Sequence, residues 1–159
     1  SAQIFPADTT RVLADDFVSL DHWSEYGSTT ADYRLAPEMS LGHGGSLYIP
    51  PASARLVRPT AMEAGRSYLL TCWAHPVAGE TGVPRIQLAD AKTLDETSHF
   101  STQLLRGLNP GWNRLAVTLS IPDGWPEVWL RLARLSSGDG GGWFHGLRIT
   151  RINESEDTQ

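Results

Sequence analysis

The sequence predicts an all-β domain, an antiparallel β-sandwich of about eight strands in two sheets. Short segments in which apolar and polar residues alternate recur along the chain, separated by turn-forming residues. The 15 Gly and 10 Pro among 159 residues also favour many turns over long helices. Only residues 14–26 and 90–100 resemble helices, and neither keeps an apolar face for three turns, so both are read as strand and loop.

In the alternating segments apolar residues recur at about every second position, and turn-forming residues such as Gly or Pro flank each segment. Gly65 can take the turn before residues 66–74, and Gly146 predicts a bulge or a position of close backbone approach in the last segment. Together with a strand in the region 14–26, these segments make about eight strands. They are residues 46–49, 54–59, 66–74, 85–91, 113–121, 127–135 and 143–152.

The chain fits a single folded domain, which we place at residues 12–152. Residues 1–11 are polar and irregular and are expected to be an arm or a linker stub. Residues 153–159 are acidic, have no apolar period, and are expected to be a tail or a second linker stub.

Composition excludes several classes of partner. A net charge of −5 without a Lys/Arg cluster argues against nucleic acid, and it disfavours anionic polymers, although a local arginine pair could still bind one. No stretch approaches the roughly 20 apolar residues of a membrane span. The single cysteine, Cys72, rules out an intrachain disulfide.

The acidic and histidine residues do not form a catalytic or zinc-binding pattern. Most carboxylates fall in predicted turns, whereas a polysaccharide hydrolase needs two of them about 5 to 10 Å apart across a cleft. The five histidines have no i, i+2 or i, i+4 pair, so no zinc site is written in the sequence. We therefore expect no catalytic residues.

Two of the six tryptophans stand out because they occupy the non-core parity of strands whose core parity is already apolar. In residues 66–76, Tyr68, Leu70, Cys72 and Ala74 form the core stripe, and Trp73 faces the other way. Trp129 has the same position in residues 127–135. A sugar ring has an apolar face and a fringe of hydroxyls, so its receptor combines an aromatic platform with planar hydrogen-bonding groups. The candidate site is Trp73, Trp129, Arg131, Gln87, Arg85, His75 and Thr71.

Six motifs follow one another along the chain: "DDFVSLDHWSEYG", "GHGGSLYI", "PTAMEAGRSYLLTCWA", "PGWNRLAVTLSIPDG", "VWLRLARL" and "GGWFHGLRITRI". Their order resembles a known family, the accessory carbohydrate-binding modules with a galactose-binding-like jelly roll that are attached to xylanases and glucanases. The resemblance covers nearly the whole of residues 12–152.

The resemblance implies a non-catalytic jelly roll that binds a glycan chain on one concave sheet, as part of a larger extracellular or cell-surface protein. It also implies a structural calcium, for which Asp15 and Asp16 are the candidate ligands. The family commonly closes with an Asp pair after the aromatic residue of the last strand, and here those positions are His145 and Gly146. That departure weakens the case for calcium, which takes six to eight oxygen ligands.

Two other interpretations stay open. Trp73 and Trp129 would be a second core layer if residues 1–40 or a neighbouring domain covered them, with Tyr26 or Tyr33 packed against them. The domain would then be an architectural or protein-interaction sandwich of a phage tail, an adhesin or a multidomain enzyme. Alternatively, Arg85, Gln87, His75 and Tyr48 could form the constellation of a small jelly-roll polysaccharide lyase.

Overall fold

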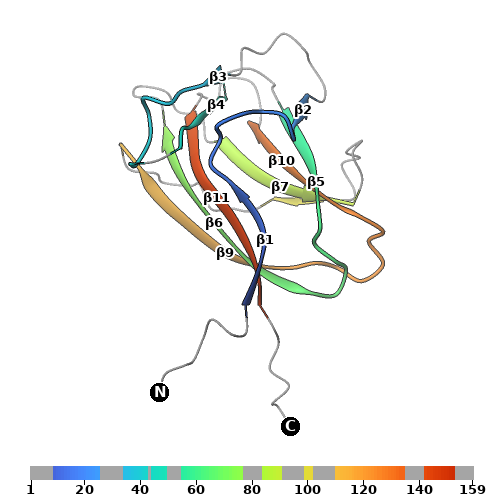
Figure 1. Cartoon of the computed structure of the whole chain (residues 1–159). Coiled ribbons are helices and arrows are strands. Elements are labelled where there is room, and N and C mark those ends of the chain that lie inside the picture. Colours follow the sequence, from blue (N-terminus) through green and yellow to red (C-terminus); the bar gives the residue numbers. More distant parts are fainter. Residues whose placement is uncertain are drawn as a thin grey trace, which may run out of the picture.

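The computed structural model describes residues 9–25, 34–42, 44–49, 55–76, 84–90, 99–101, 110–134 and 142–152. All regular structure in these ranges is β-strand, and the strands form two antiparallel sheets packed face to face (Figure 1). The predicted two-sheet all-β sandwich is confirmed. No helical segment in the described part of the chain has the length and apolar character of a membrane span.

In the described part of the chain eleven strands make up the two sheets, and each of the seven alternating segments overlaps one of them. In chain order they are β1 (Thr9–Asp15), β2 (Ser24–Glu25), β3 (Arg34–Leu35), β4 (Leu47–Ile49), β5 (Arg55–Thr60), β6 (Ser67–Pro76), β7 (Pro84–Ala89), β8 (His99–Ser101), β9 (Asn113–Ser120), β10 (Val128–Arg134) and β11 (Gly142–Ile152).

Within the described ranges, sheet A has six strands and sheet B has five. Sheet A runs in the order β3-β4-β11-β6-β9, and β1 also pairs with β11. The first part of β11 pairs with β4 and the last part pairs with β1, while β6 follows the other edge of β11 along almost its whole length. Sheet B runs in the order β2-β5-β10-β7-β8.

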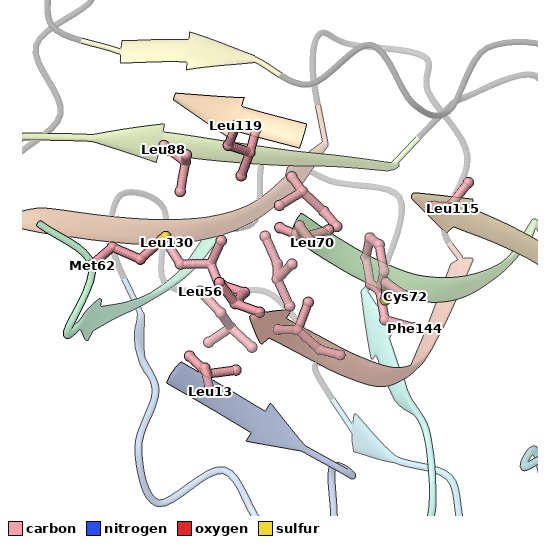
Figure 2. Packing of buried hydrophobic residues seen from close by; sticks show 14 of the residues in the cluster. Leu13, Leu56, Met62, Leu70, Cys72, Leu88, Leu115, Leu119, Leu130 and Phe144 are labelled. Atoms are coloured by element: carbon pink, nitrogen blue, oxygen red, sulfur yellow. The ribbon is translucent and has the colours of Figure 1, made fainter. Parts of the chain in front are cut away.

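The core lies between the sheets and is built by alternation. Along β6, Tyr68, Leu70, Cys72 and Ala74 are buried while the residues between them are half-buried, which confirms the predicted core stripe. Buried aliphatic side chains of sheet B, such as Leu130 of β10, belong to the same core cluster as this stripe (Figure 2). Burying one such side chain away from water stabilises the folded state by about 1.5–3 kcal/mol. The sum of these contributions holds the two sheets together.

The predicted bulge at Gly146 is confirmed. His145 pairs with Trp73 and Arg148 pairs with Thr71, so two residues of β11, Gly146 and Leu147, lie opposite Cys72 alone. Gly146 has a φ of 60°, a left-handed conformation that glycine adopts without steric cost. Because the bulge inserts one extra residue, the alternation shifts by one position after it. Leu147 therefore points into the core and Arg148 points outward.

The first strand begins earlier than the sequence suggested. Thr9, Thr10 and Arg11 pair with the end of β11, so three residues of the stretch expected to be irregular belong to sheet A. Residues 14–26 contain the end of β1 and then β2, in agreement with strand and loop. Of the other ambiguous stretch, residues 91–98 lie outside the described residues.

Candidate functional site

The predicted site residues lie on two different sheets. Trp73 is on β6 of sheet A and faces away from the core, as do Thr71 and His75. Trp129 is on β10 in sheet B. The expectation that the two tryptophans lie across one concave sheet is therefore wrong, because alternation specifies the face of a strand but not the sheet to which that strand belongs.

The part of the predicted site on sheet B is largely closed. Arg131 and Gln87 form a cross-strand pair, and their exposed fractions are 2% and 1%. Arg131 Nε donates a hydrogen bond to Gln87 Oε1, so these groups are held by each other. Trp129 packs on the buried Val57 and Ala89. Arg85 pairs with Ala133 in the same ladder, and its side chain lies outside the described residues.

An accessible pocket surrounds Trp73 on the outer face of sheet A. Its volume is about 210 Å³, and we call it the Trp73 pocket; its lining residues are Thr71, Cys72, Trp73, Arg114, His145, Gly146 and Arg148. Strand register brings them together, because Trp73 is paired with Arg114 of β9 on one side and with His145 of β11 on the other. Directly paired side chains start about 4.5–5.5 Å apart, close enough to share one hollow.

The absence of a side chain at Gly146 keeps the edge of Trp73 open. A Cβ atom at this position would lie 3.7 Å from Cδ1 of the indole, in van der Waals contact with it. The bulge thus contributes to the pocket in two ways: it leaves the indole edge uncovered, and it sets the direction of Arg148.

Two of the basic side chains in the pocket have fixed positions. Arg148 Nη2 donates to Asp16 Oδ1 at 2.7 Å, and Nη1 donates to the carbonyl oxygen of Leu147 at 3.0 Å. His145 Nδ1 lies 2.7 Å from the carbonyl oxygen of Gly45, which can only accept, so Nδ1 carries the hydrogen. His145 is thus a buried, hydrogen-bonded structural histidine.

The side chain of Cys72 points into the core, on the opposite face of β6 from Trp73. Burial raises the pKa of Cys72 from 9.0 to about 12, because the low-dielectric interior disfavours the thiolate. Its Sγ donates to the carbonyl oxygens of Trp73, at 3.4 Å, and His145, at 3.5 Å. A thiol that stays protonated at neutral pH has little reactivity, so the pocket offers shape and polarity for binding.

A row of rings crosses sheet A next to the pocket. Tyr48 and Trp143 are 5.3 Å apart between centroids, Trp143 and His75 are 5.4 Å apart, and His75 and Trp112 are 5.2 Å apart. The two contacts of His75 are edge-to-face, at 84° and 88°. His75, predicted to bind a glycan, is therefore packed between two indoles, and none of these four rings is among the residues that line the Trp73 pocket.

The two residues proposed for calcium do not fit a calcium site. Asp15 Oδ2 accepts from Trp23 Nε1 at 2.7 Å and from Arg58 Nη1 at 3.2 Å, while Asp16 is paired with Arg148. Both carboxylates line a hollow of about 520 Å³ in which Arg58 already supplies the positive charge. Within the described ranges there is no group of three metal-ligating side chains, so the structure gives this prediction no support.

The constellation suggested for a polysaccharide lyase is not assembled. Tyr48 and His75 are on the outer face of sheet A, while Gln87 and Arg85 belong to β7 of sheet B. The core of the sandwich separates the two pairs, so the four residues do not share one site.

Sequence reasoning missed the basic half of the Trp73 pocket. Arg114 and Arg148 are separated by 34 positions in the sequence, and only the order β11-β6-β9 brings them to the same hollow. Arg114 has the outward parity of its strand, which was the one available signal. The sequence alone did not show that β9 lies beside β6.

Comparisons with known proteins give structural matches only. No family model matches the chain, and no curated protein matches its sequence. Among solved structures, the chain is similar to the Clostridium thermocellum endo-1,4-β-D-xylanase 10B CBM22-1 and GH10 modules complexed with xylohexaose (TM-score 0.69, 14% identity, 89% of this chain and 29% of that one).

Two further matches cover similar shares of this chain. One is the CBM22-1 xylan-binding domain of Paenibacillus barcinonensis Xyn10C (TM-score 0.64, 12% identity, 91% of this chain and 96% of that one). The other is the enzymatically active domain of tailspike protein 4 of bacteriophage CBA120 (TM-score 0.60, 17% identity, 86% and 20%). The chain spans nearly all of the isolated xylan-binding domain but less than a third of the two larger chains. It therefore has the β-sandwich fold of these carbohydrate-binding modules.

Proposed function

We propose that this domain is a non-catalytic carbohydrate-binding module and that a sugar ring stacks on Trp73 in the Trp73 pocket. The observation that carries the proposal is a partly exposed indole at an open, polar hollow on the outer face of a sheet. Sugar-binding sites combine such an aromatic platform with nearby hydrogen-bonding groups. Here Thr71 and Arg114 supply those groups.

The fold supports the same proposal. Two of the similar structures are a xylanase complexed with xylohexaose and a xylan-binding domain, so xylan is the first ligand to test. We also propose that the domain works as an accessory part of a larger protein outside the cell or at its surface. One stacking contact contributes about 1–2 kcal/mol, so it needs several hydrogen bonds beside it to reach millimolar binding, which is about 4 kcal/mol.

The proposal is tested by comparing two tryptophan variants on opposite sides of the sandwich. Binding to soluble xylan and to xylohexaose is measured by affinity electrophoresis and calorimetry, after a glycan array with the wild-type protein. Trp73→Ala should weaken binding about 5- to 30-fold, the loss expected for one stack. Trp129→Ala is the matched control, since it removes a half-buried tryptophan from sheet B. Circular dichroism and thermal unfolding confirm that each variant is folded.

Each other outcome has a definite meaning. Loss of binding in Trp129→Ala with unchanged binding in Trp73→Ala would place the glycan on sheet B and refute the Trp73 pocket. No glycan binding by the wild-type protein, combined with self-association in static light scattering, would favour the architectural sandwich.

A further inference from the structure

The Trp73 pocket is basic in a protein that is acidic overall. Among its seven lining residues are two arginines and a histidine, and none of the seven is a carboxylate. The net charge of the chain is −5, so this local excess of positive charge runs against the composition. Charges separated by more than about 8–10 Å are largely screened at physiological salt, so the pocket and not the net charge governs a ligand bound there.

The two arginines differ in how much of their charge is balanced. The guanidinium of Arg148 is 2.7 Å from the Asp16 carboxylate and is also held by a backbone carbonyl. Arg114 is exposed, and within the described part of the chain it makes no side-chain hydrogen bond or ion pair. The pocket therefore contains one positive charge that no described carboxylate neutralises.

Arg114 has the right position to reach the rim of a sugar that lies on the indole. It is the direct partner of Trp73 across β6 and β9, and both side chains project from the outer face. A stacked pyranose covers the indole with its ring and presents its substituents at the rim, within reach of a long side chain on the neighbouring strand. A planar guanidinium with several N–H donors matches a carboxylate better than a neutral hydroxyl.

We propose that the Trp73 pocket selects an acidic sugar, a uronic acid whose ring stacks on Trp73 and whose carboxylate pairs with the Arg114 guanidinium. The inference rests on the proposed function and adds the ligand class. Arg148 and Asp16 then act as a neutral, fixed pair at the other side of the pocket, so that one carboxylate is enough to satisfy the site.

The experiment uses one polysaccharide in two charge states. Glucuronoxylan and the same material after reduction of its carboxyl groups are compared by affinity electrophoresis and calorimetry. The wild-type protein should bind the native form about fivefold more tightly than the reduced form, the strength of a well-placed exposed ion pair. This preference should decline as NaCl rises from about 0.02 M to about 0.5 M, because salt screens exposed charges.

Arg114→Gln removes the charge and keeps a polar, shorter side chain that can still donate a hydrogen bond. It should bind both forms equally, with an affinity no higher than the wild-type protein has for the reduced form, since Arg114 also hydrogen-bonds the neutral sugar in the proposed function. Arg66→Gln is the matched control, because Arg66 is an exposed arginine outside the pocket. It should leave the preference unchanged.

The outcomes separate this inference from the proposed function. Equal binding of both forms by the wild-type protein, or an unchanged preference in Arg114→Gln, would overturn the acidic-sugar inference and leave glycan binding intact. An equal loss of preference in Arg66→Gln would also overturn it, because attraction would then be a general charge effect. Failure of the wild-type protein to bind either form or any neutral glycan would overturn the proposed function itself.

Discussion

The Cys72 thiol belongs to the core of the domain, on the opposite face of β6 from Trp73. It is almost fully buried, and its neighbours on the inner side are the apolar residues of the sandwich (Figure 2). Burial keeps the thiol protonated by raising its pKa from 9.0 to about 12. The unfolded chain has no such constraint, so its cysteine loses the proton near the ordinary value.

This difference makes the free energy of unfolding dependent on alkaline pH. The folded state holds the proton more tightly, so the stabilisation is complete below pH 9.0 and is lost progressively between pH 9.0 and about 12. Urea unfolding of the wild-type protein and Cys72→Ala should therefore give pH profiles that converge across this window. Because other groups titrate in both proteins, only the difference between the profiles counts. A constant difference would contradict the assignment.

At the level of single residues, the sequence was right about the direction of side chains and wrong about exposure. The core stripe of β6, from Tyr68 to Ala74, follows the predicted alternation. Arg131 and Gln87 also have the predicted non-core parity, yet both are buried. Alternation predicts the face of the strand on which a side chain lies, but it does not predict whether other residues cover that face.

The β11 bulge is the element on which the Trp73 pocket depends most directly. Gly146→Ala should destabilise the domain by about 1–2 kcal/mol, because an L-residue at a φ of 60° is strained. Space is not the obstacle, since the added Cβ would meet the nearest indole atom at 3.7 Å. Chemical denaturation measures the cost.

Gly146→Asn provides the control for this prediction, since asparagine tolerates the left-handed region better than alanine does. We expect the asparagine variant to lose less stability, although its side chain is larger. If alanine were tolerated as well as glycine, the backbone strain assigned to the bulge would be wrong.

Elements with a long enough pattern were predicted well from the sequence. The seven alternating segments and both special glycines, Gly65 in its turn and Gly146 in its bulge, have the predicted places. The short strands β2, β3 and β8 were not separated from loops. Two or three residues are too few to show a two-residue period, and such strands form because a neighbouring strand offers them hydrogen-bonding partners.

The arrangement of the whole molecule depends on partners that are distant in the sequence. Strands β6 and β10 have the same alternating pattern, but they lie in different sheets. Nothing local to Trp73 or Trp129 distinguishes these two positions. The Trp73 pocket needs β6, β9 and β11 side by side, so its basic character became visible only with the strand order.

The first and last strands are neighbours, with Thr9 paired with Ile152 (Figure 1). A circular permutant that joins these ends by a short flexible linker and opens the exposed turn at residues 122–124 should therefore fold and retain the same ligand binding. Cooperative unfolding and affinity electrophoresis test this.

Opening the chain between Leu70 and Thr71 should prevent folding, because it cuts a central strand of sheet A. A well-folded product of that second cut would contradict the central role of β6.

The same pairing determines how the domain would respond to mechanical force. Because β1 and β11 are antiparallel and Thr9 lies opposite Ile152, a pull applied through the two ends acts first on the outermost backbone hydrogen bonds of the ladder. These bonds open one after another, as in a zipper, and do not share the load. Held by both ends in a chain under tension, the domain would release β1 at low force while the core of the sandwich is still packed.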